Sequence, residues 1–382
     1  MSFRYIKVKT KGQIEGEKLL VPKLRFKKFN NEYKKYKIGD TLKVKSGKDQ
    51  KLIECTNGKY PILGTGGQIG TTNNFLYDKP SVLIGRKGTI NKPQYMTTPF
   101  WTVDTLFYTD IKEGFNTKYI FYAFQNINWK KYDESTGVPS LSCKTIEEIL
   151  YYIPNKDEQD KISTFITLLD KKIELQQRRI EALKIYKRGL IQRIYNRTWN
   201  NKIKMEEILI QKSIRNTNDE IHNVYSVSNK DGFILQTEQF KDRIVASEDT
   251  RNYKVVAKND FAYNPARINV GSIARMKQDI KGIISPMYIC FKCNEKILPE
   301  YLEYFFESSK FTYEMSKRLE GSVRMCLSYE SMLNIPIELP NKNEQEKIST
   351  FLNSLSNKIK LEEKKFMELN KLKKGLLQKM FI

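Results

Sequence analysis

A long internal repeat constrains this chain more than any other feature of its sequence. At an offset of 186 residues, PNKDEQDKISTFITLLDKKIEL from Pro154 aligns with PNKNEQEKISTFLNSLSNKIKL from Pro340. The alignment continues without a gap to Tyr195 and Phe381, and 19 of the 42 aligned positions are identical. Similarity of this length means that one structural unit is used twice in the chain.

Each copy of the repeat predicts one long helix. Asn155 stands three residues before Glu158, and Asn341 three before Glu344, which is the spacing of a reciprocal N-terminal capping box. Apolar residues then recur at alternating steps of four and three, a pattern typical of a coiled-coil seam. Each helix should hold about 39 residues. The predicted seam residues are Ile162, Ile166, Leu169, Ile173, Ile180, Leu183, Leu190 and Ile194 in the first copy, and Ile348, Leu352, Leu355, Ile359, Phe366, Leu369, Leu376 and Met380 in the second.

Polar residues interrupt the two seams at equivalent positions. They are Gln176 and Lys187 in the first copy, and Glu362 and Lys373 in the second. Two seams that match in this way favour pairing of the helices with each other, and the sequence leaves the orientation open. The alternative is that two amphipathic helices pack separately on two cores.

A glycine lies inside each predicted helix, Gly189 in the first and Gly375 in the second. Glycine costs about 1 kcal/mol relative to alanine in a helix interior. Close contact with another helix or with a partner subunit would explain both residues, and so would fraying near the helix end.

The segments upstream of the two helices differ from them in composition. Stretches such as KPSVLIGRKGTI and NYKVVAKNDFAYNPARINVGSIARM predict strands joined by tight turns, while TKYIFYAFQNI and PEYLEYFFESSKF predict short helices at matching places. The sequence therefore predicts an α/β protein in which globular blocks and long helices alternate. The expected boundaries are an N-terminal extension over 1–21, globular domains over 22–153 and 201–339, and helical regions over 154–200 and 340–382.

The charge of the chain indicates a polyanionic partner. Lysine and arginine outnumber the acidic residues 67 to 44, which gives a net charge of +23. An excess of this size is typical of proteins that bind nucleic acid. The abundance of Lys, Asn, Ile, Tyr and Phe would also follow from an AT-rich genome, but that bias should supply acidic residues as well.

Several kinds of catalytic chemistry are disfavoured by the residues present. His222 is the only histidine, which disfavours catalytic triads and histidine acid–base relays. No GxxxxGK[ST] loop occurs, so the sequence does not encode an ATP-driven motor. The nearest approach to the Asn/Asp-Pro-Pro-aromatic motif of an amino-methyltransferase is NPAR, from Asn264 to Arg267, which lacks the second proline and the aromatic ring.

The cysteines and the chain start indicate a cytoplasmic protein. The five cysteines are irregularly spaced, and CFKC, from Cys290 to Cys293, is the only CxxC pair. We therefore expect neither a disulfide framework nor a metal site. The start, MSFRYIKVKTKG, is charged rather than signal-like, and no apolar run is long enough to span a bilayer.

The stretch GTGGQIG, from Gly64 to Gly70, superficially resembles a phosphate-binding loop. The third glycine of a dinucleotide fingerprint would fall on Ile69, and the following TTNNFLYDKPSV is a poor helix former. A phosphate cradle needs a helix start at that point. We therefore expect a glycine turn between two strands.

The motifs PNKxEQxKIS, KxGLxQ and PSVLIGRKGTI resemble the specificity subunit of bacterial type I restriction-modification systems. The resemblance covers nearly the whole chain from about Pro22, and the doubled arrangement strengthens it. It implies two target recognition domains, each reading half of a bipartite DNA sequence, and two conserved helices that form an antiparallel coiled coil. It also implies assembly with two methylation subunits and two restriction subunits, and no catalytic centre in this chain. S-adenosylmethionine, ATP and Mg²⁺ would then be bound only by the partners.

Two turns carry the candidate DNA contacts. Arginine suits guanine, asparagine suits adenine, and lysine mostly contacts phosphate, although solvated loops carry the same residues. The candidates are Arg86, Lys87, Thr89, Asn91 and Lys92 in IGRKGTINKP, and Asn264, Arg267, Asn269 and Arg275 in YNPARINVGSIARM.

Two other functions compete with this interpretation. One is a coiled-coil DNA-binding regulator that acts without enzyme partners. The other is a stand-alone S-adenosylmethionine-dependent methyltransferase. The two globular blocks share their layout but little sequence, so we expect an asymmetric target with different half-sites.

Overall fold

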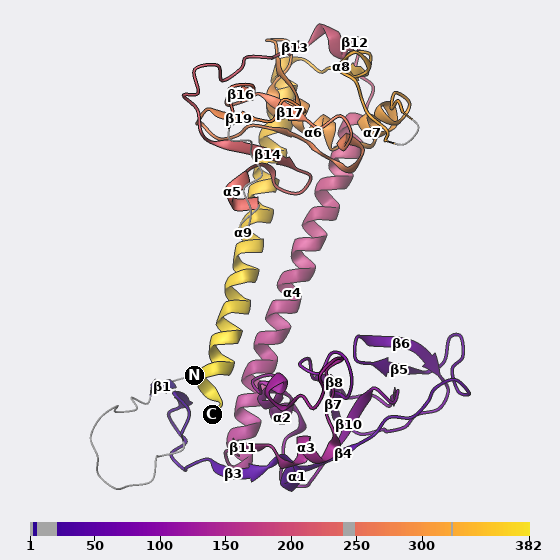
Figure 1. Cartoon of the computed structure of the whole chain (residues 1–382), viewed down its shortest axis with the longest axis vertical. Helices are drawn as coiled ribbons and strands as arrows, with labels where there is room; N and C mark the ends of the chain where they lie inside the picture. The colour runs from indigo at the N-terminus through magenta and orange to yellow at the C-terminus, as the bar shows by residue number, and fades with distance from the viewer. Residues whose placement is uncertain (1–2, 6–20, 240–248, 322–323) are drawn as a thin grey trace. The chain divides into compact units, whose positions relative to one another are not determined.

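The chain divides into two compact units, each built from its own internal contacts. The computed structural model describes residues 3–5, 21–239, 249–321 and 324–382. Unit 1 comprises Met1–Gln177 and Lys364–Ile382, and unit 2 comprises Arg178–Glu363. The division passes through both long helices, so each unit contains a globular part and a length of each helix (Figure 1).

The two long helices are confirmed. They are α4, Lys156–Tyr195, and α9, Lys342–Met380 (Figure 1). Each begins at the expected asparagine, whose side-chain oxygen accepts from the backbone N–H of the glutamate three residues on, at 3.0 Å in α4 and 2.9 Å in α9. In α4 the prediction that the glutamate side chain reaches back to the backbone of the capping asparagine is wrong. The carboxylate of Glu158 binds Arg25 instead.

The helices pair antiparallel within each unit. In unit 1, Ile162 and Ile166 near the start of α4 share a core with Leu376 and Met380 near the end of α9. In unit 2, Ile191 near the end of α4 shares a core with residues near the start of α9. Every predicted seam residue is buried or half-buried. Arg179 and Lys184 of α4 also form ion pairs with Glu362 and Glu363 of α9, so the two helices pair with each other, as the coiled-coil prediction requires.

The globular part of unit 1 is an assembly of small sheets. Its main sheet has the antiparallel order β4-β10-β7-β8, and the inner strand β7 is buried along its whole length. The strands are β1 Phe3–Tyr5, β2 Leu24–Phe26, β3 Lys34–Lys37, β4 Leu42–Lys45, β5 Tyr60–Gly64, β6 Gly67–Thr72, β7 Ser81–Gly85, β8 Gln94–Met96, β9 Trp101–Thr102, β10 Leu106–Ile111 and β11 Leu150–Ile153. The short helices are α1 Ile38–Thr41, α2 Thr117–Phe124, η1 Trp129–Tyr132 and α3 Cys143–Glu148.

Unit 2 repeats this layout. Its sheet β13-β20-β17-β18 has the same antiparallel arrangement, and β12-β21 corresponds to the strand pair β3-β11. Its strands are β12 Lys202–Lys204, β13 Leu209–Gln211, β14 Val224–Ser228, β15 Gly232–Leu235, β16 Lys254–Val256, β17 Phe261–Tyr263, β18 Ile273–Arg275, β19 Gly282–Ile284, β20 Ile289–Cys293 and β21 Pro336–Glu338. Its short helices are η2 Met205–Glu207, α5 Gln236–Gln239, η3 Ile268–Val270, α6 Pro299–Phe306, α7 Ser309–Ser316 and α8 Tyr329–Leu333.

One element of unit 1 has no counterpart among the described sheets of unit 2. This element is the strand pair β1-β2, in which Phe3 pairs with Phe26. The ring of Phe3 lies 4.6 Å from that of Phe26 and 5.3 Å from that of Phe165 on α4. The start of the expected N-terminal extension therefore belongs to the core of unit 1, while residues 6–20 lie outside the described residues. Among the described helices, none is long and apolar enough to cross a membrane.

Candidate nucleic-acid interface

The first candidate turn connects β7 to β8 and is held by backbone hydrogen bonds. The N–H of Arg86 donates to the carbonyl of Thr105 at 2.8 Å, and the N–H of Gly88 donates to that of Pro139 at 2.8 Å. A Cβ atom on Gly85 would lie 2.3 Å from the carbonyl oxygen of Thr89, so only glycine fits there. Backbone hydrogen bonds therefore tie this turn to Thr105 and Pro139.

This turn presents three polar side chains to solvent. Lys87, Asn91 and Lys92 are exposed, whereas Thr89 is half-buried. Arg86 is also half-buried, because its guanidinium lies 6.0 Å from the centre of the Phe107 ring. The exposed lysines suit phosphate contacts, and the exposed asparagine suits a base edge.

The second candidate turn occupies the equivalent place in unit 2, between β17 and β18. Arg267 and Asn269 are exposed there. Asn264 is buried, and its side-chain oxygen accepts from the N–H of Ala266 at 3.1 Å. Asn264 therefore shapes the turn, while Arg267 and Asn269 project from it.

Arg275 lies apart from the exposed residues of that turn. Its side chain is buried at the end of β18, where its guanidinium binds Glu300 and, at 2.9 Å, Glu303, both on α6. Asn259 accepts a further hydrogen bond from it at 2.6 Å. Breaking such a buried charge cluster is costly, so we leave Arg275 out of the interface that we propose.

The stretch GTGGQIG forms a hairpin, as its sequence predicts. β5 and β6 pair through Gly64 and Gly67, and the backbone of Gly67 adopts a φ of +115°. No helix follows, because β6 continues to Thr72. The hairpin therefore lacks the helix N-terminus that a phosphate cradle requires.

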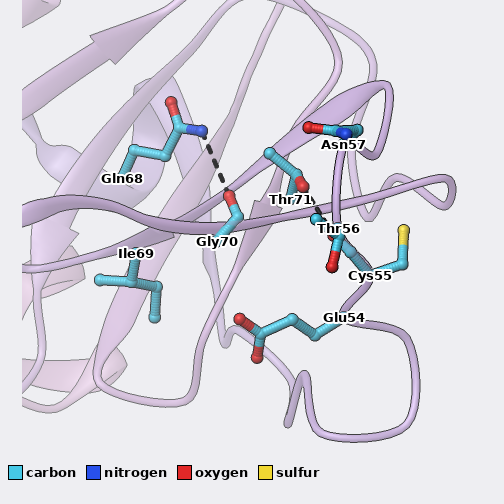
Figure 2. Close-up of a pocket in the computed structure, with 8 residues that line it drawn as sticks. All are labelled: Glu54, Cys55, Thr56, Asn57, Gln68, Ile69, Gly70 and Thr71. Atoms are coloured by element: carbon cyan, nitrogen blue, oxygen red, sulfur yellow. Dashed lines mark hydrogen bonds between the residues drawn. The ribbon is translucent and has the colours of Figure 1, made fainter.

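The hollow beside this hairpin is also unsuited to phosphate. It measures about 580 Å³ and is lined by Glu54–Asn57 and Gln68–Thr71 (Figure 2). Glu54 is the only charged residue of this lining, and its negative charge would repel an anion. A Cβ atom on Gly70 would lie 2.5 Å from a carboxylate oxygen of Glu54, so this glycine makes room for a neighbouring side chain.

One glutamine on each long helix joins it to a short helix, a role that the sequence did not predict. Gln159 donates to the carbonyl of Pro154 at 3.0 Å and accepts from the N–H of Asn116, which caps α2, at 2.9 Å. Gln345 donates to the carbonyl of Pro340 at 3.1 Å and accepts from the N–H that precedes α6 at 2.8 Å. The feature that could have revealed these glutamines is that the residue is identical in the two repeats although it does not lie on the seam.

Equivalent tyrosines make a second joint. The hydroxyl of Tyr122 on α2 donates to the carboxylate of Asp170 on α4 at 2.8 Å. The hydroxyl of Tyr304 on α6 donates to the side chain of Asn353 on α9 at 2.8 Å. The short helices are thereby held against the long ones in the same way in both units.

The lysines that interrupt the seams complete these joints. Lys187 binds Glu307 at 2.9 Å and lies 4.9 Å from the centre of the Tyr304 ring in unit 2. Lys373 binds Asp170 at 2.8 Å and lies 5.8 Å from the centre of the Tyr122 ring in unit 1. Lys187 therefore connects α4 to the globular part of unit 2, whereas Lys373 links α9 to α4 beside the ring of Tyr122.

Of the two CFKC cysteines, which lie in unit 2, Cys290 is buried and Cys293 is half-buried. All five cysteines of the chain are free thiols, and burial raises the pKa of both Cys290 and Cys293 to about 12. A thiol with this pKa stays protonated at neutral pH, whereas metal binding requires the thiolate. Within the described ranges, no cluster of three His, Cys, Asp or Glu side chains is arranged to hold a metal ion.

Comparison with known proteins covers both halves of the repeat. The family model for the type I restriction modification DNA specificity domain matches residues 30–184 and 202–371. The chain is similar to the type I restriction enzyme MjaVIII specificity subunit of Methanocaldococcus jannaschii, at 24% identity over 295 residues that span 68% of each protein. A putative type I specificity subunit of Mycoplasma pneumoniae, S.MpnORF89P, is 23% identical over 152 residues, 37% of this chain and 45% of that protein.

Solved structures share the fold at low sequence identity. The crystal structure of the S subunit of a type I restriction-modification system from M. genitalium superposes with a TM-score of 0.63 at 16% identity, covering 95% of this chain and 99% of that one. A structure that describes complex assembly and conformational transition of the type I R-M system gives a TM-score of 0.54 at 10% identity, covering 91% and 97% of the two chains.

Proposed function

The chain belongs to the family of type I restriction modification DNA specificity domains, and we therefore propose that it reads the DNA target of a type I restriction-modification complex. The observation that carries the proposal is the doubled family match, to residues 30–184 and 202–371. Each match contains one of the two candidate turns, and each of these turns exposes Arg, Lys or Asn side chains. One turn would read each half of a bipartite target.

The two half-sites should differ in sequence. The turn of unit 1 exposes Lys87, Asn91 and Lys92, whereas that of unit 2 exposes Arg267 and Asn269. Both turns expose an asparagine, but only the turn of unit 2 exposes an arginine, which favours guanine, so the two turns offer different base preferences. This supports an asymmetric target.

Apolar residues on the outside of the long helices support docking of two methylation subunits. Unit 1 exposes Leu175 and Leu372, and unit 2 exposes their repeat equivalents Leu361 and Tyr186. Single exposed apolar residues are ordinary, but two sets related by the repeat favour two copies of one partner.

The helix glycines support the same docking. A Cβ atom on Gly189 or Gly375 would meet nothing within 4 Å among the described residues. The chain itself therefore supplies no close packing that would explain either glycine. We infer that a partner helix approaches α4 and α9 closely there, and that two restriction subunits bind to the resulting complex.

We also propose that the chain has no catalytic activity of its own. Its interface turns hold neither a nucleophile–base pair nor a cluster of carboxylates. S-adenosylmethionine, ATP and Mg²⁺ would be bound by the methylation and restriction subunits.

Reconstitution with the methylation subunit tests the proposal. Cells that carry both proteins should methylate a motif of two short blocks separated by a fixed unspecific gap, as read by long-read methylome mapping. A continuous palindrome would contradict the two-domain assignment. Failure of the methylation subunit to copurify would favour a stand-alone DNA-binding regulator, and heat of S-adenosylmethionine binding to the isolated chain would favour a methyltransferase.

A further inference from the structure

The repeat places the same three side chains on both long helices, but their surroundings differ between the two units. Glu158, Ile162 and Phe165 form one stripe along the start of α4. Glu344, Ile348 and Phe351 repeat it without a substitution at the start of α9, although fewer than half of the aligned repeat positions are identical. We call the second set the α9 stripe.

In unit 1 the strand pair β1-β2 covers the stripe of α4. Arg25 on β2 binds the carboxylate of Glu158 through two hydrogen bonds, of 2.8 and 2.6 Å, and both side chains are buried. Phe3 on β1 and Phe26 on β2 place their rings 5.3 and 5.8 Å from the ring of Phe165. The guanidinium of Arg25 and the rings of Phe3 and Phe26 therefore cover the stripe of α4.

In unit 2 the outer part of the α9 stripe is accessible to solvent: Ile348 packs against the core of the unit, but Phe351 is exposed and Glu344 is half-buried. Phe351 is 49% exposed, and Glu344 accepts a hydrogen bond from Lys347 of the same helix at 3.2 Å. No described strand pair of unit 2 corresponds to β1-β2. Only residues 196–201 connect α4 to β12, and this connection is too short to supply such a strand pair.

Unfilled space adjoins the start of α9. A hollow of about 520 Å³ is lined by Arg197–Asn201 and Leu339–Asn341. Asn341 is the residue that caps α9, so the hollow reaches the end of the stripe that carries Glu344. A polypeptide segment that lay along the stripe would therefore find room beside it.

We propose that the α9 stripe is a docking site for a segment of the methylation subunit that presents a basic side chain and an aromatic ring. Phe3, Arg25 and Phe26 fill the matching site of unit 1 from within the chain. The inference rests on the proposed function. It adds that one of the two methylation subunits makes a contact that the other lacks.

Photocrosslinking in the assembled complex tests this directly. p-Benzoylphenylalanine placed at position 351 should crosslink to the methylation subunit on irradiation. Placed at position 165, it should crosslink within the chain, to peptides that contain Phe3 or Phe26. Position 75 is the matched control, because Phe75 is 48% exposed and lies outside the stripe.

Substitutions supply a second measurement that does not depend on the probe. Phe351→Ala should weaken retention of one methylation subunit about tenfold, so that dilution yields a complex with a single copy. Glu344→Lys should act in the same direction, whereas Glu346→Lys, an exposed position on the same helix, should not.

The outcomes separate this inference from the proposed function. An intact complex that shows no crosslink from position 351 above the position 75 control overturns the docking site alone. Equal effects of Glu344→Lys and Glu346→Lys would do the same. If the methylation subunit does not bind the chain at all, the proposed function fails, and the docking site fails with it.

Discussion

Gln159 and Gln345 show how a single repeated residue can define a joint between elements. Each carboxamide satisfies a carbonyl before a long helix and an N–H at the start of a short one. Polar groups at buried helix ends need such partners, because an unmet hydrogen bond there costs about 1 to 3 kcal/mol.

We therefore expect Gln345→Ala to lower the free energy of unfolding by about 1 to 3 kcal/mol, because the partly buried N–H of Leu298 loses the acceptor that the buried Gln345 side chain supplies. Hydrogen exchange of the peptide that begins α6 should accelerate as well. Gln378→Ala, at an exposed position of the same helix, should change the unfolding free energy by less than about 0.5 kcal/mol. Equal losses for the two variants would show that this joint contributes little.

The exposed lysines of the first turn should contribute to the salt dependence of DNA binding. Lys87→Ala combined with Lys92→Ala should weaken DNA binding by the assembled complex. The dependence of log affinity on log salt should become shallower by about one unit for each lost phosphate contact. Lys130→Ala combined with Lys131→Ala removes the same charge from exposed positions of η1 and should leave the slope unchanged. If both pairs change the slope alike, net charge rather than this turn governs binding.

Sequence reasoning located the two turns but not the burial of their side chains. Lys87 and Arg275 look equally available in a basic, glycine-containing stretch. Arg275 is buried because Glu300 and Glu303, more than twenty residues away, approach it from α6. Such a contact depends on packing between elements, which no local pattern records.

At the scale of elements, the long helices were the most predictable part of the fold. Their seams repeat over many turns, so period alone separates the inner face from the outer one. The strand β1 was not predicted, because three residues are too few to show a period, and its partner β2 lies about twenty residues away. Its place is set by Phe165, whose ring Phe3 and Phe26 cover.

Two leucines of α9 test the difference between its faces. Leu352→Ala should lower the free energy of unfolding by about 2 to 5 kcal/mol, because this side chain is fully buried in the core of unit 2. Leu361→Ala should leave stability within about 0.5 kcal/mol but weaken retention of the methylation subunit, since Leu361 is exposed. Denaturant titration and copurification would measure the two effects. A large stability loss for Leu361→Ala would contradict its assignment to the docking face.

At the scale of the whole molecule, the paired helices predict control over the gap in the DNA target. Inserting four residues after Ile173 adds about 6 Å to α4 and turns its continuation by about 40°. Since base pairs stack about 3.4 Å apart, the gap should grow by one or two pairs, or by less where a bulge absorbs the insertion. The half-site bases should stay the same, because the domains that read them are untouched.

Methylome mapping of the insertion variant would measure both the gap and the half-sites. The same four residues inserted after Gly114, an exposed turn in unit 1, should leave the gap unchanged. An unchanged gap combined with altered half-site bases in the α4 variant would contradict the role of the helices as a ruler.

Unit 1 is completed by residues from the very end of the sequence. The ring of Phe381 lies 5.1 Å from that of Tyr119, and the carbonyl of Leu377 accepts from Asn126 at 3.1 Å. Unit 2 is one continuous segment, Arg178–Glu363. During synthesis on the ribosome, unit 2 can therefore mature while the chain is still growing, whereas unit 1, although made first, must wait with an unfinished core until the last turns of α9 emerge.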